Sequence, residues 1–476
     1  MQEITYLFPF EKVAPGAKIL IYGAGMVGQE YLRQIMVTGY CDVIGFLDRA
    51  WDKHAPLVVE IFPPQKVSSL QYDFVVLAFD SYNIAIDAQS TLLKMDVPLN
   101  KIVYVGQRVF DADISVGKNL SEPARQYGYA FEKGPLAIAL KYPATLGDAI
   151  QRKALLLEIA KVFKGCLIDI YVTKETFIKA FYRDVPELNE IVEDVGVLYH
   201  RNKKQYLLAM EVRFALFLDY LNFDLARKLG GEYEHYLKLL EKENKEYDMP
   251  LSPLTQVRIQ WERSMYRGWN VYQCYNYISF INIVNSSISI PLDSGAEEIW
   301  KGMKFEKYIV VNYGNGFSSR KNKMVDTRSW PKEYWEDFLQ IFKHRYPKIQ
   351  VVQCGDANAE KLAGVDRYAL DCDIEVTKHV LKNAILYAGT EGGLVHLATQ
   401  LGTKCVCLFG STYVELYGYK QNINIFSQKC KPCWCLYNQV SVCARGMEKP
   451  ECMYSIRPDM VLAEVERYFD SVSLDE

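Results

Sequence analysis

Short apolar runs alternate along the chain with stretches in which apolar residues recur at helical spacing. Runs of this length are typical of buried strands. The sequence predicts strands at residues 18–22, 43–47, 74–78, 101–105, 136–140, 167–172, 308–312, 349–354, 385–389 and 405–409. Because strands that alternate with helices join through crossovers, the pattern favours an α/β fold with parallel, doubly wound sheets.

The spacing of these segments indicates several domains. A chain of 476 residues exceeds one ordinary core and suggests roughly three domains. We expect an N-terminal Rossmann-like nucleotide-binding module at 1–115 and a polar linker at 116–135. Two further α/β domains are expected at 136–300 and 301–460, followed by a C-terminal helix and tail at 461–476.

A glycine-rich turn follows the first strand. Gly23, Gly25 and Gly28 form a G-x-G-x-x-G pattern that opens a helix, and Asp48 ends the next strand. Such glycines allow a tight turn against a pyrophosphate, and the acidic residue binds ribose hydroxyls. The stretch resembles the small Rossmann modules of sugar acetyltransferases and nucleotide-sugar epimerases, which implies a bound nucleotide. A fold-conserving turn that binds nothing is the alternative.

A second glycine-rich turn lies between the strands at 385–389 and 405–409. Thr390, Glu391, Gly392 and Gly393 precede a helical stretch in which His396 lies in the first turn. Glycines let the backbone approach a ligand, and unpaired N–H groups at a helix start bind phosphate. The turn is therefore a candidate phosphate cradle, and an ordinary α/β turn with a satisfied histidine is the alternative.

The stretch GTEGGLVHLATQLGTKCVCLFGST at 389–412 resembles the signature of glycosyltransferase family 9, the ADP-heptose:lipopolysaccharide heptosyltransferases and their relatives. Glu391 stands where that family usually has Asp, and Ser411 stands where it usually has Pro. The resemblance implies a GT-B architecture of two Rossmann-like domains facing a cleft, preceded here by the additional small Rossmann-like domain. It also implies a nucleotide-diphospho-sugar donor bound by residues 390–393, His396, Ser411 and Thr412, with the final helix from Pro458 packed across the cleft.

Asp148 is the candidate general base. It ends a Leu-Gly-Asp triplet after the strand at 136–140, which is similar to the opening of family 9, where this aspartate is the proposed base. A carboxylate suits the task, because an acceptor hydroxyl must lose its proton as it attacks the anomeric carbon. A helix N-cap is the alternative role, since Asp is a preferred cap residue.

Arg328 is the candidate diphosphate ligand. It lies two places before Trp330-Pro331, in a basic loop that also holds Arg320, Lys321 and Lys323. In family 9 a basic residue at this place contacts the donor diphosphate. A guanidinium binds phosphate oxygens in a bidentate manner, and a solvated basic loop is the alternative.

A cysteine cluster occupies residues 430–452. Cys430 and Cys433 have the C-x-x-C spacing of a metal site, and Cys443 and Cys452 complete four ligands, with Cys435 as a spare. All-sulfur ligands select zinc or iron, and a comparable pattern in some family 9 relatives implies a structural ion. Reduced thiols without a metal are the alternative.

Net charge gives no reason to expect nucleic acid, because it is only −3 at pH 7. No apolar run reaches the length of a membrane span, and the start lacks a signal-peptide pattern. We therefore expect a cytoplasmic protein, with peripheral contact at the inner membrane and oligomerisation left open.

These observations predict an inverting glycosyltransferase that moves heptose or a related sugar to a glycan, lipid-linked or protein acceptor. A nucleotide-dependent oxidoreductase or epimerase led by the N-terminal module is one alternative. An inactive GT-B scaffold that binds a nucleotide-sugar is the other.

Overall fold

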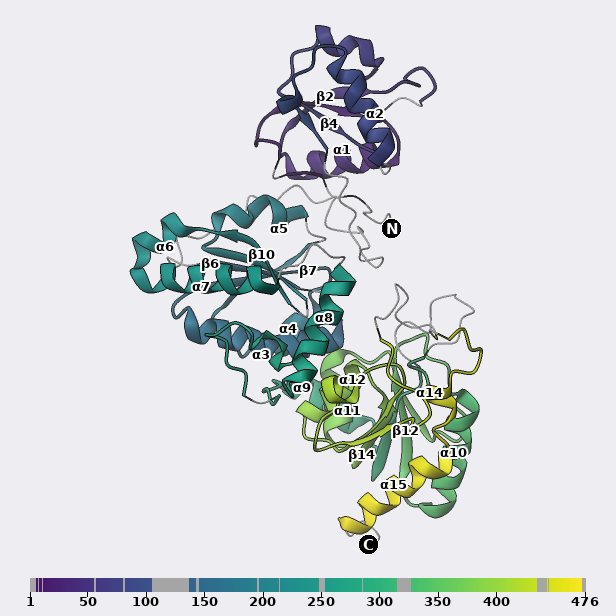
Figure 1. Cartoon of the computed structure of the whole chain (residues 1–476). Coiled ribbons are helices and arrows are strands. Elements are labelled where there is room, and N and C mark those ends of the chain that lie inside the picture. Colours follow the sequence, from purple (N-terminus) through teal and green to yellow (C-terminus); the bar gives the residue numbers. More distant parts are fainter. Residues whose placement is uncertain are drawn as a thin grey trace.

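The computed structural model describes residues 6, 8–10, 12–54, 57–79, 82–104, 137–142, 145–194, 197–213, 215–247, 253–284, 286–314, 327–434, 443 and 445–472. Within them the chain forms three bodies, each built on one sheet (Figure 1). The linker expected at 116–135 lies outside the described residues, as do Arg320, Lys321, Lys323 and Cys435.

The first body is a small doubly wound domain. Its strands are β1 (Lys18–Tyr22), β2 (Asp42–Leu47), β3 (Ile61–Phe62), β4 (Phe74–Leu77) and β5 (Ile102–Val103). They pair in parallel in the order β3-β2-β1-β4-β5. Helices α1 (Met26–Thr38) and α2 (Tyr82–Leu93) and the short turns η1 (Pro64–Ser69) and η2 (Leu99–Lys101) complete the domain. Apolar side chains on both faces of the sheet form two separate cores.

The second body carries the sheet β10-β9-β6-β7-β8, in which only the β9–β10 pair is antiparallel. Its strands are β6 (Ala137–Tyr142), β7 (Leu167–Val172), β8 (Leu188–Glu193), β9 (Leu208–Val212) and β10 (Leu216–Leu221). Its helices are α3 (Leu146–Val162), α4 (Thr176–Tyr182), α5 (Val197–Asn202), α6 (Phe223–Leu229), α7 (Gly231–Tyr247) and α8 (Pro253–Tyr266), with η3 (Lys203–Gln205) and η4 (Gln273–Tyr275). The sequence pattern predicted neither β9 nor β10.

The third body is built on six parallel strands in the order β13-β12-β11-β14-β15-β16. These are β11 (Tyr308–Val311), β12 (Gln350–Gly355), β13 (Arg367–Leu370), β14 (Leu386–Thr390), β15 (Cys405–Phe409) and β16 (Ile423–Phe426). The helices are α9 (Ser294–Gly302), α10 (Lys332–Arg345), α11 (Ile374–Lys382), α12 (Gly393–Gln400), α13 (Val414–Tyr417), α14 (Glu451–Tyr454) and α15 (Pro458–Ser471). The predicted α/β class with doubly wound parallel sheets is confirmed.

The final helix does not cross between domains, so that expectation was wrong. Helix α15 packs on α10 within the third body, at the lower end of the molecule in Figure 1. The ring of Phe469 lies 5.0 Å from that of Tyr346 and 6.3 Å from that of Phe342. Val461 and Val465 are fully buried in the same core. Burial of this apolar face against α10 determines where the helix docks.

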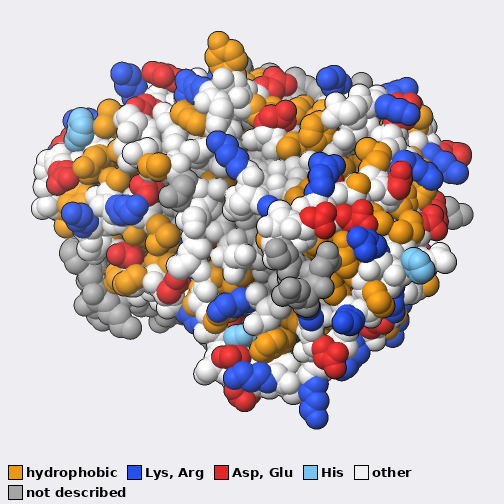
Figure 2. Space-filling model, turned by 90° about the horizontal axis from the view of Figure 1, so that it is seen from below, with side chains coloured by type: hydrophobic (Ala, Val, Ile, Leu, Met, Phe, Trp, Pro, Cys, Tyr) orange, Lys and Arg blue, Asp and Glu red, His pale blue; other side chains and the backbone are white. Residues whose placement is uncertain are grey.

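The second and third bodies share one continuous apolar core, which runs through α3 and α12. These two helices lie side by side at the boundary between the bodies, with α4 packed on α11 beside them (Figure 1). On the lower face, Lys and Arg side chains are intermixed with Asp and Glu among the described residues (Figure 2). No helix in the described part of the chain is both long and apolar enough to span a bilayer.

Candidate active site

The topology brings the two predicted donor loops together. In the third sheet the strand order reverses between β11 and β14, and ligands of doubly wound sheets bind at the carboxyl ends of the strands at such a point. Arg328 lies near the end of the loop between β11 and α10, and the loop after β14 is the turn at Gly392 and Gly393. A Cβ atom placed on Gly392 would lie 4.0 Å from Arg328 Nη2. The guanidinium therefore borders the glycine-rich turn.

Arg328 is held by a buried carboxylate. Its Nη2 lies 3.0 Å from Glu391 Oε2 and donates to the Glu391 carbonyl oxygen at 3.1 Å. The two side chains are 13% and 5% exposed. An ion pair with so little water around it fixes the orientation of the guanidinium more firmly than a surface pair does.

His396 lies between the second and third bodies. Its Nε2 is 2.9 Å from the amide nitrogen of Gln151 on α3, and its Nδ1 is 2.7 Å from the Tyr419 hydroxyl. Burial lowers the pKa of this imidazole from 6.5 to about 4, so the ring is neutral near pH 7. Since an amide NH₂ can only donate, Nε2 is the acceptor and Nδ1 carries the proton. His396 thus joins the two bodies, and both of its ring nitrogens have protein partners.

Asp148 is not the helix cap, so the alternative role weighed for it was wrong. The N-cap of α3 is Thr145, whose Oγ1 accepts from the Asp148 backbone N–H at 3.3 Å. The same hydroxyl donates to Asp148 Oδ2 at 2.5 Å, and the Arg152 guanidinium donates to Oδ1. Arg152 is 1% exposed, so a buried cation and a hydroxyl together orient the carboxylate.

The starts of α3 and α12 touch each other. A Cβ atom on Gly147 would lie 3.3 Å from His396 Cδ2 and 3.5 Å from Gly393 Cα. A Cβ atom on Gly393 would lie 2.9 Å from Leu146 Cβ and 3.0 Å from the Gly147 nitrogen. Glycine at both positions is what allows this approach. The triplet that carries Asp148 therefore packs directly on the glycine-rich donor turn.

The turn after β15 lies against the same loops. Ser411 Oγ accepts from Thr327 Oγ1 at 2.9 Å, and the Ser411 N–H donates to the Thr327 carbonyl at 3.3 Å. The Thr412 hydroxyl is buried and meets no hydrogen-bond partner among the residues that the structure describes. A buried hydroxyl of this kind carries a desolvation penalty unless a ligand satisfies it. Thr390, 4% exposed, ends β14 beside this turn.

In the N-terminal module, the Asp48 carboxylate accepts hydrogen bonds from backbone N–H groups of two neighbouring turns. Its Oδ2 accepts from the Ala24 N–H and its Oδ1 from the Ala50 N–H, each at 2.8 Å. Gly23 has a φ of +113°, and a Cβ atom on Gly28 would lie 1.9 Å from the Gly23 carbonyl oxygen. Gly25 has open space around it. The glycines therefore shape the turn, and the Asp48 carboxylate is already engaged by backbone N–H groups.

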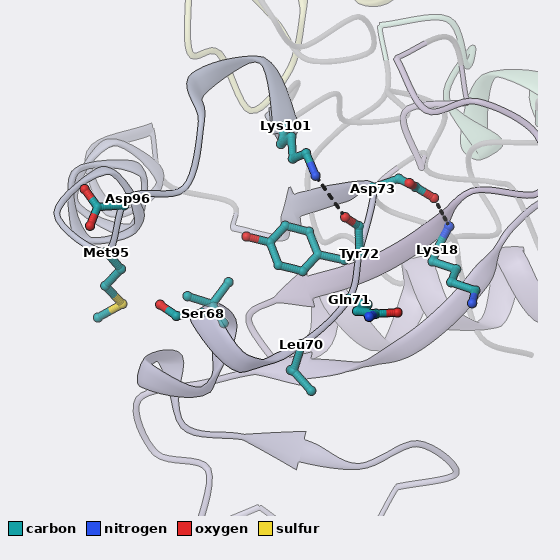
Figure 3. Close-up of a pocket in the computed structure, with 10 residues that line it drawn as sticks. Lys18, Ser68, Leu70, Gln71, Tyr72, Asp73, Met95, Asp96 and Lys101 are labelled. Carbon is teal, nitrogen blue, oxygen red and sulfur yellow. Dashed lines mark hydrogen bonds between the residues drawn. The ribbon is translucent and has the colours of Figure 1, made fainter.

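A hollow of about 620 Å³ opens at the other edge of that first sheet (Figure 3). Lys18 opens β1, and Asp73 and Lys101 directly precede β4 and β5. Lys101 Nζ donates to the Tyr72 carbonyl at 3.2 Å, above the Tyr72 ring. Because this is the amino edge of the strands, it is not where a doubly wound sheet binds a nucleotide.

The four predicted cysteine ligands come near one another from three segments. Burial, and then the neighbouring thiols of Cys430, Cys433 and Cys443, raise the pKa of the Cys452 thiol to about 12. Within the described ranges, however, no three His, Cys, Asp or Glu side chains stand in an arrangement that could hold a metal ion. The donor set matches zinc or iron in its chemistry, but the thiols are not gathered into a coordination shell.

Three side chains that the sequence reading did not select belong to this region. Arg152 follows Asp148 by four residues on α3, a spacing that signals a helical ion pair and could have been noticed. Gln151 and Trp434 carry no local signal, since their partners His396 and Arg328 are distant in the sequence.

Comparison with protein families gives two matches. The model of glycosyltransferase family 9 (heptosyltransferase) matches residues 304–441, and that of the C2185-like N-terminal domain matches residues 16–103. The first match confirms the predicted resemblance and the predicted class of activity, glycosyl transfer from a nucleotide-sugar donor. A search among curated proteins finds no match.

Solved structures of several glycosyltransferases are similar to the chain. A family 9 glycosyltransferase from Veillonella parvula is 13% identical over 70% of this chain and 97% of its own, with a TM-score of 0.45. ADP-heptose LPS heptosyltransferase II of E. coli is 13% identical over 71% and 100%, with a TM-score of 0.42. The iron-containing dodecameric glycosyltransferase TibC from enterotoxigenic E. coli is 12% identical over 71% and 76%, with a TM-score of 0.47. At these values the likenesses do not transfer those proteins' properties to this chain.

Proposed function

We propose that this chain transfers heptose or a related sugar, with inversion, from a nucleotide-diphospho-sugar to a hydroxyl of a glycan, lipid-linked or protein acceptor. One observation carries the proposal. The helix start that holds Asp148 packs on Gly393, while the Arg328 guanidinium borders Gly392 on the same turn. A base and a diphosphate ligand thus lie on two domains that meet at one glycine-rich turn. Inverting transfer needs this arrangement, because the acceptor attacks opposite to the departing diphosphate.

Binding of the donor diphosphate is supported by positive charge and by hydrogen-bonding groups that a phosphate can satisfy. The first N–H groups of α12 have no partner within their own helix and carry its positive dipole end. The planar fork of Arg328 matches two phosphate oxygens, and its buried pair with Glu391 fixes its direction. The Thr412 hydroxyl gains a partner when a phosphate oxygen arrives. Together these groups offset the negative charge that develops on the leaving diphosphate.

The acceptor side rests on Asp148. Each carboxylate oxygen has two lone pairs, so the bonds from Thr145 and Arg152 do not prevent Asp148 from accepting a third proton donor, the acceptor hydroxyl. As that hydroxyl attacks the anomeric carbon, its proton passes to Asp148 and the sugar–diphosphate bond breaks. The fixed orientation of the carboxylate lowers the cost of reaching this geometry.

A structural zinc or iron bound by Cys430, Cys433, Cys443 and Cys452 is part of the proposal. The support is the C-x-x-C spacing of Cys430 and Cys433 and the presence of the Cys430, Cys433 and Cys443 thiols near that of Cys452. When bound, the ion would close the loops between these residues and would take no part in bond making. A nucleotide in the N-terminal module is a weaker proposal, supported by the glycine turn alone. We also propose that the reaction occurs in the cytoplasm, or at the inner membrane for a lipid-linked acceptor.

The first test is a thermal-shift screen of nucleotide-sugars, since a bound ligand stabilises the folded state. With the donor found, Arg328→Ala should weaken its binding by about 1.5–3 kcal/mol, roughly 10- to 150-fold in Kd. Arg345→Ala is the matched control, because it removes an exposed arginine that pairs with Glu466 on the surface of the same domain. Unchanged affinity in Arg328→Ala would remove this residue from the site.

A further inference from the structure

We propose that Trp434 is a positioning residue for Arg328 and thereby for donor binding. This inference rests on the proposed function. The guanidinium carbon of Arg328 lies 4.8 Å from the centre of the Trp434 ring. The contact is mostly shielded from water, since the Arg328 side chain is 13% exposed. A cation over an indole face is attracted by the ring, and more strongly when both groups are desolvated.

The Trp434 ring and the buried Glu391 carboxylate both restrain the Arg328 guanidinium, each in a different way. Glu391 engages Nη2 through both its side-chain and carbonyl oxygens, which fixes one end of the fork. A flexible arginine can still rotate about that point. The flat face of Trp434 restricts this rotation, so that the guanidinium keeps one orientation toward the turn at Gly392.

The backbone of Trp434 is fixed to the turn after β15. The N–H groups of Cys433 and Trp434 both donate to the Ser411 carbonyl, at 2.9 and 3.0 Å. Ser411 in turn bonds twice to Thr327, the residue that precedes Arg328. These contacts form a closed circuit: Arg328 stacks on Trp434, Trp434 bonds to Ser411, and Ser411 bonds to Thr327, which precedes Arg328 in the chain.

Two residues of the cysteine cluster at 430–452 lie next to this circuit of contacts. Cys433 is adjacent to Trp434 and shares its carbonyl partner, and the Cys452 sulfur lies 4.0 Å from the Thr327 carbonyl oxygen. Cys433 and Cys452 therefore contact the backbone on both sides of the stacked pair formed by Trp434 and Arg328.

The test measures Kd for ADP and for UDP by calorimetry in the wild type and in five variants. Trp434→Leu should weaken binding about tenfold, whereas Trp434→Phe, which keeps an aromatic face, should stay near wild type. Trp269→Leu is the matched control, because Trp269 stacks on exposed Arg267 at the same 4.8 Å and should not change affinity. In an Arg328→Ala background, Trp434→Leu should add nothing, since its effect passes through Arg328.

Equal losses in both backgrounds would overturn the proposal, because Trp434 would then act independently of Arg328. So would full affinity in Trp434→Leu. A second measurement needs no ligand: the ring current of Trp434 should shift the Arg328 Hε resonance, and Trp434→Leu should abolish that shift. If wild type binds neither nucleotide, the proposed function loses its support, while an Arg328 resonance unchanged by Trp434→Leu would refute the stacking separately.

Discussion

Gly393→Ala tests whether the contact between α3 and α12 sets the catalytic geometry. The added Cβ would point across the domain boundary, 2.9 Å from Leu146 Cβ and Cγ and 3.0 Å from the Gly147 nitrogen. Carbon atoms pack at about 3.5–4.0 Å, so each contact is too close by roughly 0.5–1 Å. A backbone nitrogen and a Cβ atom cannot move away as a flexible side-chain end can. The strain must therefore be relieved by separating the two helix starts.

The expected cost follows from that displacement. Overpacking of this size costs about 1–3 kcal/mol of folding free energy, which the shared core between the two bodies can absorb. A misplacement of about 1 Å between reacting groups, however, lowers rate about 10²-fold. The bond of 2.9 Å between Gln151 and His396 lies on the same boundary and would stretch as well. We thus expect a large loss of turnover with a modest loss of stability.

Turnover, melting temperature and nucleotide affinity together test this prediction. Nucleotide affinity should change little, because the added methyl faces Leu146 and not Arg328. Gly302→Ala is the control, since a Cβ atom at Gly302, the last residue of α9, meets nothing within 4 Å. Wild-type turnover in Gly393→Ala, with an unchanged melting temperature, would show that the two helix starts do not touch during catalysis.

Three further predictions concern single side chains. Asp148→Asn should lower turnover by about 10²–10⁴ and also lower the melting temperature, because the buried Arg152 loses its charged partner although Thr145 still caps α3; full turnover in the folded variant would contradict this. The pKa of His396 falls from 6.5 in the unfolded chain to about 4 in the folded protein. Below pH 6.5 the unfolded chain therefore takes up the proton first, and stability should fall by up to about 3 kcal/mol between pH 6.5 and 4; His396→Gln should flatten this slope in urea titrations. Elemental analysis should find about one zinc or iron per chain, lost in Cys452→Ser and kept in Cys435→Ser.

Local signals in the sequence predicted much of the fold and the position of the loops. Buried strands appear in the sequence as apolar runs, and glycine-rich stretches indicate where the backbone must bend or approach a neighbour. The turn at Gly392 and Gly393 was therefore found together with the strands on either side of it. The docking of α15 was not, because an amphipathic helix shows which face it buries and not the surface that receives it.

Long-range pairs of side chains could not be predicted. Arg328 and Glu391 were both selected as donor ligands, yet nothing local indicates that they form a buried ion pair across 63 residues. Asp48 was read as a ribose ligand, which stays a prediction, and nothing local indicated that its carboxylate also accepts from two backbone N–H groups. Such pairings depend on the tertiary packing, which brings together groups whose neighbours in sequence are unrelated.

Two buried lysines tie the second and third bodies to the segment that connects them. Lys153 of the second body donates to the Ser289 carbonyl at 2.8 Å, and Lys378 of the third donates to those of Pro291 and Ala180 at 2.8 and 2.7 Å. Both ammonium groups are fully buried, and burial lowers the pKa of each. Rotating the domains apart would remove these carbonyl partners from buried ammonium groups, at a cost of several kcal/mol. The connecting segment is therefore a tether between the two domains, and it helps to keep the start of α3 against Gly393, which is the preorganisation that the proposed glycosyl transfer requires.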